Sequence, residues 1–221
     1  MKKWICLTAI MLWGMLSLSA CSDPMLSEEE RQDIIDQITI LETSEYDLVY
    51  FNINYQQYLE QVNGIIDDTY LKSIEDQIIF GYDDKKYTRA DLVDMSTQEW
   101  EEHKDHMLPL IQGIGMDNQK SVISFSKVYE DEASKKIYIY TTEDKVLNGK
   151  AFTKTNRKYT FDRIKDRWLV TSVEFDKFTY GSEQTEEEIQ TSISGLKYQT
   201  HADKPVEYIE ETITLEGTGT S

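Results

Sequence analysis

Residues 152–178 read FTKTNRKYTFDRIKDRWLVTSVEFDKF, and this stretch decides the fold class. Apolar and polar residues alternate along 152–164 and again along 168–178, which is typical of two β-strands. Asp166 and Arg167 lie between the two runs and predict a tight turn. Because side chains alternate along a strand, the second strand is expected to group four residues on one face: Leu169, Thr171, Val173 and Phe175.

Two further strands are predicted upstream of this hairpin. The period of the sequence changes to two from Lys120, and a second short run of strand-forming residues covers 137–140. Asn148-Gly149 then precedes residues 152–164, and this dipeptide is the strongest short-range signal for a hairpin. The four strands are therefore expected to form an antiparallel sheet, and the alternation in 206–215 predicts one more strand.

The residues before the sheet predict helices. A helix is expected to begin at Ser27, with three glutamates in its first turn, and to end near Glu42. A second helical stripe covers 55–80, and a third helix begins at Thr88 with an acidic residue three positions later. Pro109 is expected to end or kink that third helix.

Residues 46–54 fit either a buried strand or a helical turn, so their structure stays open at this point. Helices followed by antiparallel strands define an α+β fold, in which the N-terminal helices pack on a sheet of about four long strands. The hairpin residues 159–163 and 166–173 resemble the last hairpin of the NTF2-like (cystatin-like cone, SnoaL-like) superfamily, over about 45–180. This resemblance implies a curved sheet with a pocket between helices and sheet.

The N-terminus carries a separate signal. Residues 2–3 are lysines, 4–18 are almost wholly apolar, and 18–21 read Leu-Ser-Ala-Cys. The segment resembles the bacterial lipoprotein signal, which implies cleavage after Ala20 and a diacylglyceryl thioether on Cys21. That lipid would hold the protein on the extracytoplasmic face of the cell membrane. The alternatives are an ordinary secretory signal and an uncleaved anchor.

These observations divide the chain into four parts. We expect a signal peptide at 1–20, a tether at 21–27, an NTF2-like domain at 28–180 and an acidic C-terminal extension at 181–221. The formal net charge of the chain is −18, and removal of the two signal-peptide lysines would leave −20. Such acidity argues against nucleic acid as a partner.

Three polar residues are candidates for chemistry in the pocket. His103 and His106 are three positions apart, and therefore share a face of the predicted helix, where a divalent cation could bind with neighbouring glutamates. The alternative is a packed histidine, which the apolar stripe favours, and we expect no metal and no cofactor. Some SnoaL-like enzymes use Asp and His as acid and base; by that resemblance His103 and Asp94 are the first candidates.

The sequence favours a non-enzymatic role. We expect a binding or scaffolding module, anchored through Cys21, for an envelope protein or a small ligand, or one that self-associates. The alternative is a SnoaL-like enzyme acting on a small molecule in the pocket. An enzyme would need convergent polar groups and a strongly shifted pKa in a closed pocket, whereas a scaffold would need an exposed apolar face.

Overall fold

The computed structural model describes residues 25–217. The signal peptide, Cys21 and the first part of the tether lie outside the described residues, as do residues 218–221. The helices are α1 Glu28–Val49, α2 Tyr55–Val62, α3 Asp68–Ser73, α4 Arg89–Val93, α5 Thr97–Gly113 and α6 Glu186–Ser194, with a short 3-10 turn, η1, at Met116–Asn118. The strands are β1 Ile78–Tyr82, β2 Lys85–Thr88, β3 Gln119–Ser126, β4 Tyr129–Asp131, β5 Lys136–Leu147, β6 Lys150–Ile164, β7 Arg167–Thr179, β8 Thr200–His201, β9 Lys204–Pro205 and β10 Tyr208–Glu216.

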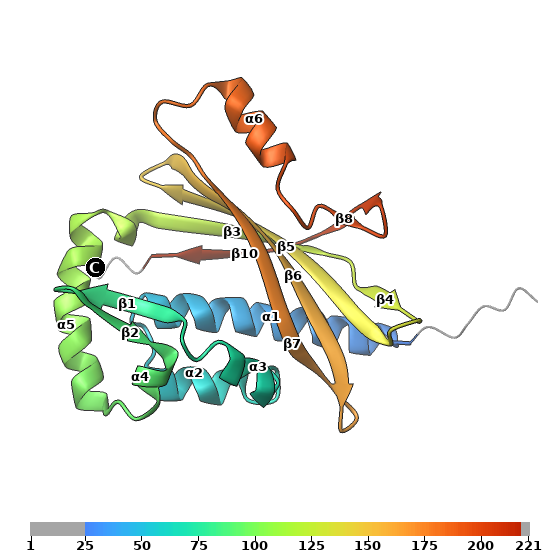
Figure 1. The fold of residues 1–221 in the computed structure, drawn as a ribbon, viewed down its shortest axis with the longest axis horizontal. Helices are drawn as coiled ribbons and strands as arrows, with labels where there is room; N and C mark the ends of the chain where they lie inside the picture. Colours follow the sequence, from blue (N-terminus) through green and yellow to red (C-terminus); the bar gives the residue numbers. More distant parts are fainter. Residues whose placement is uncertain (1–24, 218–221) are drawn as a thin grey trace, which may run out of the picture.

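The predicted α+β class is confirmed. Six strands form the main sheet in the order β10-β3-β5-β6-β7, with β4 also paired to β5, and each printed pair in it is antiparallel. The predicted late strand corresponds to β10, which adds to the free side of β3 rather than following β7. Figure 1 shows α1 crossing one side of this sheet, with α2 and α3 below it.

Helix α1 begins as predicted but ends later. Ser27 accepts a hydrogen bond from the backbone N–H of Glu30, whose side chain accepts one from the Ser27 N–H. The helix continues past Glu42 to Val49, because Tyr46 and Leu48 are both buried, on two sides of the helix. Residues 50–54, left open by the sequence, form the connection to α2 rather than a strand.

The predicted helix over 55–80 is wrong in its second half. Gly64 has a φ of +80°, which ends α2, and Asp67 caps the separate short helix α3. Residues 78–88 then form the β1–β2 hairpin, in which Asp83 and Asp84 have positive φ. A capping residue is thus a better guide to these boundaries than the apolar stripe.

The helix predicted from Thr88 is divided into two. Thr88 caps α4 as expected, but Ser96 forms a second capping box and begins α5. Pro109 does not end α5, which continues to Gly113. Pro109 is exposed, so water can bind the backbone carbonyl that loses its helical partner there.

The two long hairpins form at the predicted places, although the second turn consists of Lys165 and Asp166 rather than the predicted Asp166 and Arg167, because Arg167 pairs with Ile164. Asn148 and Gly149 both have positive φ between β5 and β6, and Lys165 and Asp166 do so between β6 and β7. Leu147 and Lys150 are the last cross-strand pair before the first turn. Local turn chemistry therefore sets the register of these three strands.

A β-bulge corrects the predicted faces of β7. Tyr159 lies opposite Val173, but Phe161, two residues later on the same face of β6, lies opposite Val170. The extra residue in β7 brings Val173 to the face of Val170, whereas simple alternation placed these residues on opposite faces.

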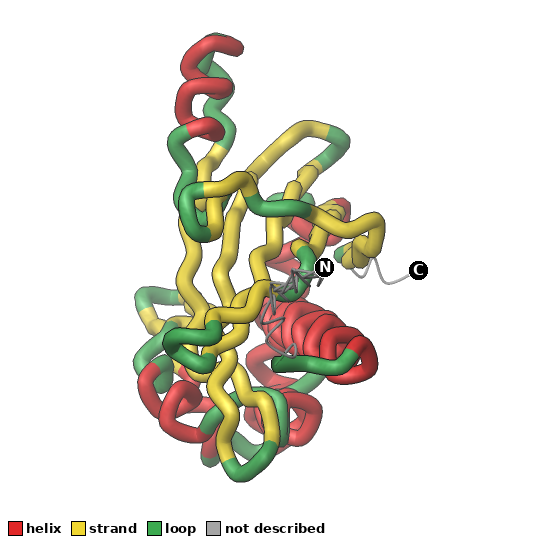
Figure 2. Tube along the Cα trace, turned by 90° about the vertical axis from the view of Figure 1, so that its right-hand side faces the viewer, coloured by secondary structure: helices red, strands yellow, loops and turns green. Residues whose placement is uncertain are grey.

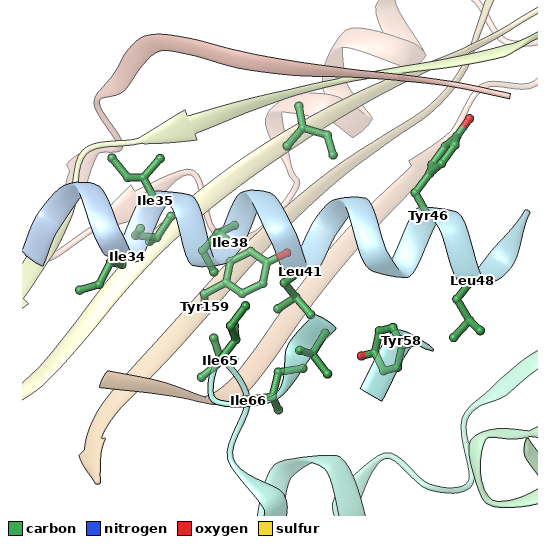
Figure 3. Close-up of a cluster of buried hydrophobic side chains, with 14 of the residues drawn as sticks. Ile34, Ile35, Ile38, Leu41, Tyr46, Leu48, Tyr58, Ile65, Ile66 and Tyr159 are labelled. Carbon is green, nitrogen blue, oxygen red and sulfur yellow. The ribbon is translucent and has the colours of Figure 1, made fainter. Parts of the chain in front are cut away.

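The main core lies between α1 and the sheet. Inward residues of α1 and of β5–β7 belong to one buried cluster, together with residues 65–66. In Figure 3 the ring of Tyr159 lies beside α1 near Ile38 and Leu41, while Leu48 and Tyr58 lie on the side away from Tyr46. Burial of such side chains contributes about 1.5–3 kcal/mol each to folding.

The C-terminal extension packs back on the sheet. Asn156 donates a hydrogen bond to the backbone oxygen of Lys197, and the Lys197 N–H donates one to Asp176. Leu196 and Val206 are buried, whereas α6 projects beyond the sheet and buries no residue (Figures 1 and 2). Within residues 25–217, no helix combines the length and apolarity needed to cross a bilayer.

Candidate functional site

The sheet face toward α1 changes character along its strands. Beneath the first half of α1 it carries Ile137, Ile139 and Phe161, which are fully buried. Toward the other end, cross-strand pairs bring polar residues to the same face, including Thr141 opposite Arg157. Further polar residues of this face include Glu143, Lys145, Thr155 and Lys177. The apolar core therefore stops partway along the sheet.

A cavity of about 670 Å³ occupies the polar half. The second half of α1 forms one wall, β5–β7 form another, and α3 with the chain up to Gln77 forms a third. Its apolar lining consists of Leu41, Val49, Ile66, Ile74, Ile123, Val173, Phe175 and Leu215, and its tyrosines are Tyr46, Tyr50, Tyr70 and Tyr159. A volume of this size is typical of small-molecule sites.

One buried ionic network forms the floor of the cavity. Arg157 Nη2 donates to Glu143 Oε2 at 2.7 Å, and Arg157 Nη1 lies 3.6 Å from Glu42 Oε1. Glu42 also accepts hydrogen bonds from the Tyr159 hydroxyl and from Thr141 Oγ1, at 3.3 Å for the latter. The network thus joins α1 to β5 and β6.

Two members of this network, Glu143 and Arg157, are held in their ionised forms. Burial raises the pKa of Glu143, but Arg157 and Lys145 together lower it more, so that its net shift is downward. Burial lowers the pKa of Arg157, and Glu42 with Glu143 raises it further than burial lowers it. The Glu143 side chain is only 5% exposed, whereas Arg157 is 21% exposed, so part of Arg157 remains accessible.

A second ion pair lies at the other side of the cavity. Arg89 on α4 is buried, and its Nη2 lies 2.8 and 2.6 Å from the two carboxylate oxygens of Glu45 on α1. Tyr58 donates its hydroxyl proton to Glu45, and the Arg89 guanidinium lies over the Tyr58 ring. Arg89 also donates from Nε to Gln77 at 2.9 Å. This pair fixes α4 against α1.

The tyrosines of the cavity are protonated at neutral pH. Tyr46 and Tyr50 stack on the same face of α1 with ring centroids 4.4 Å apart. Burial raises the pKa of Tyr50 to about 12, and burial also raises the pKa of Tyr46 and of Tyr159. With Glu143 held ionised, these groups have pKa values displaced away from neutrality. General acid–base catalysis is most effective with a pKa near the working pH, so the arrangement suits binding.

The sequence-predicted histidines lie elsewhere. His103 Nδ1 is 2.5 Å from the Tyr82 hydroxyl, and burial lowers the pKa of His103. His106 stacks on the Tyr82 ring, with the two ring centroids 4.0 Å apart. Its Nε2 lies 3.8 Å from Asp83 Oδ2. The structure thus brings both histidines to the β1–β2 hairpin. Neither is among the residues that line the cavity.

Asp94, the third candidate, is the exposed residue at the C-terminal end of α4 and does not line the cavity. In the part of the chain from 25 to 217, no group of three or more His, Cys, Asp or Glu side chains could hold a metal ion. Cys21 lies outside that part.

Sequence reasoning missed the residues that form the cavity, although two signals for them exist. Glu42 lies on the same apolar stripe of α1 as Ile35 and Ile38. Arg157 is two positions before Tyr159 on β6 and therefore shares its face of the strand. A charged residue at a position where the pattern demands an apolar one indicates a buried partner. The identity of that partner has no local signal.

A shallower cavity of about 690 Å³ lies on the opposite face of the sheet. Tyr138, Tyr140, Lys158 and His201 line it, and the Tyr140 hydroxyl is 3.0 Å from His201 Nδ1. His201 belongs to the β8–β9 hairpin, so this contact joins the C-terminal extension to β5. The extension thereby covers Tyr138 and Tyr140 on this face.

The sequence of the chain matches no protein-family model. It also matches no curated protein.

Proposed function

We propose that this protein is a non-enzymatic binding module that holds a small ligand in the cavity between α1 and the sheet. The module is carried on the extracytoplasmic face of the membrane by a lipid on Cys21. The observation that carries the proposal is the cavity itself, of about 670 Å³, with the buried network of Arg157, Glu42 and Glu143 on its floor.

An NTF2-like arrangement is part of this proposal. It is supported by the hydrogen bonds from Tyr159 and Thr141 on the sheet to Glu42 on α1, which join the first helix to the inner side of two strands. It is also supported by the bulge in β7, because bulges bend the strand that contains them. A cone-shaped domain of this kind would open where the apolar core ends, which is where the cavity lies.

Binding is favoured over catalysis by the charges of the cavity. Each of its glutamates accepts a hydrogen bond or forms an ion pair with an arginine: Glu42 and Glu143 with Arg157, and Glu45 with Arg89. The arginine beside Glu143 lowers the pKa of that carboxyl despite burial, and a carboxylate whose lone pairs are already occupied by donors is a poor general base. The same fixed groups are well suited to orient a ligand.

The lipid anchor has its own test. Met25 is only four positions after Cys21, and its N–H contacts Glu130 on β4, so a lipid on Cys21 would hold the folded domain close to the bilayer. We expect the full chain to enter the detergent phase of Triton X-114 and the variant Cys21→Ser to stay in the aqueous phase. Equal partition of both chains would contradict the anchor without touching the cavity.

Occupancy of the cavity is tested with a neutral fluorescent probe, N-phenyl-1-naphthylamine. We expect saturable fluorescence with the unmodified protein and its loss in Val173→Trp, whose larger side chain would fill the cavity. Val122→Trp is the matched control, because Val122 lies on β3 between the inward residues Ser121 and Ile123 and does not line the cavity. Circular dichroism checks that both variants fold.

A saturable signal that Val173→Trp abolishes and Val122→Trp retains would support the proposal. Probe binding that is equal in all three proteins, or absent from the unmodified one, would overturn it.

A further inference from the structure

We infer that the ligand of the inner cavity is a small amphipathic anion, whose acidic group is bound by Lys145, Arg157 and Lys177 and whose apolar part lies against Phe175 and Val173. The inference rests on the proposed function and deepens it by naming the class of ligand. A carboxylate, a sulfonate and a phosphate share the required chemistry.

The charge of the cavity is opposite to that of the protein. The whole chain has a formal net charge of −18. The cavity is lined by four cationic residues and three anionic ones, which leaves one net positive charge. The cationic residues are Arg89, Lys145, Arg157 and Lys177, and the anionic residues are Glu42, Glu45 and Glu143. A concave site with such an excess attracts anions more strongly than a flat surface does.

The carboxylates of the cavity already have partners. Glu42 accepts from Tyr159 and Thr141, and Glu143 accepts from Arg157 at 2.7 Å. Glu45 receives both Arg89 and Tyr58. A cationic ligand would therefore compete with existing donors, whereas an anionic ligand finds donors still available.

Three cationic side chains on neighbouring strands have donors that make no hydrogen bond in the described residues or form only a long ion pair. Arg157 is 21% exposed, and its Nη1 makes no hydrogen bond in the described residues, although this atom is itself buried and lies 3.6 Å from Glu42 Oε1. Lys145 on β5 has only an ion pair with Glu143 at 3.4 Å. Among residues 25–217, Lys177 on β7 has no carboxylate within 4.0 Å of its Nζ.

The strand register brings these donors to one face. Lys177 lies opposite Thr155 on β6, which in turn lies opposite Glu143 on β5. On the same face, Arg157 is two residues from Thr155 on one side of this row, and Lys145 is two residues from Glu143 on the other side. Both nevertheless reach the Glu143 carboxylate, at 2.7 and 3.4 Å. Two flexible lysines and a planar guanidinium can therefore converge on one acidic group, and an arginine fork is well matched to carboxylate or phosphate.

An apolar surface adjoins the donors. Phe175 lies directly opposite Arg157 and is 64% exposed, which is unusual for an aromatic side chain beside a cavity. Val173 is two residues before Phe175 on the same face, and Tyr70 and Ile66 also line the cavity. A ligand with an acidic group and an apolar body would cover this surface while meeting the free donors.

A matched pair of probes tests the class of ligand. 1-Anilinonaphthalene-8-sulfonate is N-phenyl-1-naphthylamine with one added sulfonate, so the two probes differ chiefly in charge. We expect the sulfonate probe to bind at least about tenfold more tightly at low salt, an advantage worth about 1.4 kcal/mol. We expect that advantage to fall several-fold in Lys177→Met and in Lys145→Met, with affinity for the neutral probe unchanged.

Lys150→Met is the control, because it removes the same charge from the same sheet at an exposed residue that does not line the cavity. Arg157 is left intact, since its loss would leave two buried glutamates without a partner. Retention of the full advantage in Lys150→Met, together with its loss in the two cavity variants, would support the inference.

If the two probes bind with equal affinity and both lose binding in Val173→Trp, the inference of an anionic ligand is overturned, and the cavity remains a binding site. An advantage of the sulfonate probe that the lysine variants or Val173→Trp do not reduce would place that probe elsewhere and also overturn the inference. Failure of both probes to bind would overturn the proposed function instead.

Discussion

At the scale of a single residue, Arg157 compensates the negative charges of two buried glutamates in the cavity. Its guanidinium contacts both Glu42 and Glu143, whose side chains are 7% and 5% exposed. We expect Arg157→Met to reduce the free energy of unfolding by about 3–5 kcal/mol, because removal of one partner leaves buried charges uncompensated. Urea denaturation at neutral pH measures this loss.

The control for Arg157→Met is the same substitution combined with Glu42→Gln and Glu143→Gln. Neutralising both carboxylates should restore part of the lost stability. The triple variant is compared with Arg157→Met and with the variant that carries only the two glutamine substitutions. If its loss of stability equals the sum of their two losses, the loss at Arg157 comes from packing rather than from charge.

Glu143 predicts a pH dependence of stability. Its pKa in the folded protein lies below the ordinary value of 4.5, despite burial, because Arg157 and Lys145 favour the ionised form. A carboxyl group whose pKa is lowered on folding stabilises the folded protein at pH values above its ordinary pKa. This stabilisation is lost as the pH falls through the pKa of the folded state. We therefore expect Glu143→Gln to flatten the decline in stability between about pH 5 and pH 3.

The same substitution at exposed Glu187 on α6 serves as the comparison for Glu143. Urea denaturation at a series of pH values gives both curves. An unchanged slope in Glu143→Gln would show that Glu143 does not contribute to acid sensitivity.

Single residues also mark the limit of sequence reasoning about the site. The chemistry and spacing of His103 and His106 predict a site, but the structure places both residues against Tyr82, outside the lining of the cavity. Arg157 and Glu42 have no chemical motif. Their importance follows from their meeting in space, since Tyr159 and Glu42 are 117 residues apart.

At the scale of an element, the β5–β6 turn depends on Gly149. Its φ is +74°, and a Cβ added there would meet no atom within 4 Å, so any cost of substitution comes from the backbone alone. We expect Gly149→Ala to destabilise the protein by about 1 kcal/mol, because L-residues disfavour this conformation. Thermal or urea unfolding measures the change.

Gly113 provides a matched comparison for Gly149. A Cβ there also meets no atom within 4 Å, but Gly113 lies in α5 and its φ is not in the left-handed range. Gly113→Ala should therefore stabilise the protein by up to about 1 kcal/mol. Equal effects of the two substitutions would contradict a role for the turn conformation.

The cap of α1 predicts a second effect at this scale. Ser27 accepts from the backbone of Glu30 and completes a capping box on the helix that forms one wall of the cavity. We expect Ser27→Ala to cost about 1 kcal/mol of global stability in urea denaturation. Thr185→Ala removes the equivalent cap of α6, which buries no residue, and should leave the global transition unchanged.

At the scale of the whole molecule, the C-terminal extension completes the sheet. β10 pairs with β3, and its residues Ile209, Ile213 and Leu215 pack against the core. We expect a chain that ends at residue 206 to lose about 3 kcal/mol or more, at about 1 kcal/mol for each half-buried side chain. Urea denaturation compares it with a chain that ends at residue 217.

The shortened chain should also self-associate. Removal of β10 leaves β3 as an open edge, and an unpaired edge readily pairs with another chain. Size-exclusion chromatography is expected to give a larger species for the chain ending at 206. A stable monomer of that chain would contradict the assignment of β10 as part of the folded domain.

The sequence by itself determined the features that depend on near neighbours. The alternation of residues 152–178, the Asn148-Gly149 turn and the caps at Ser27 and Thr88 all act within a few positions, so their signals are local. The α+β class follows from these features, because the order of helices and strands is itself local information.

Only the tertiary structure decided where those elements end and what they bring together. The bulge in β7, the extension of α1 to Val49 and the pairing of β10 with β3 each depend on contacts between distant segments. The cavity has the same origin. Arg157 and Glu42 are held together by long-range packing, and the free energy of such contacts is absent from any short stretch of the chain.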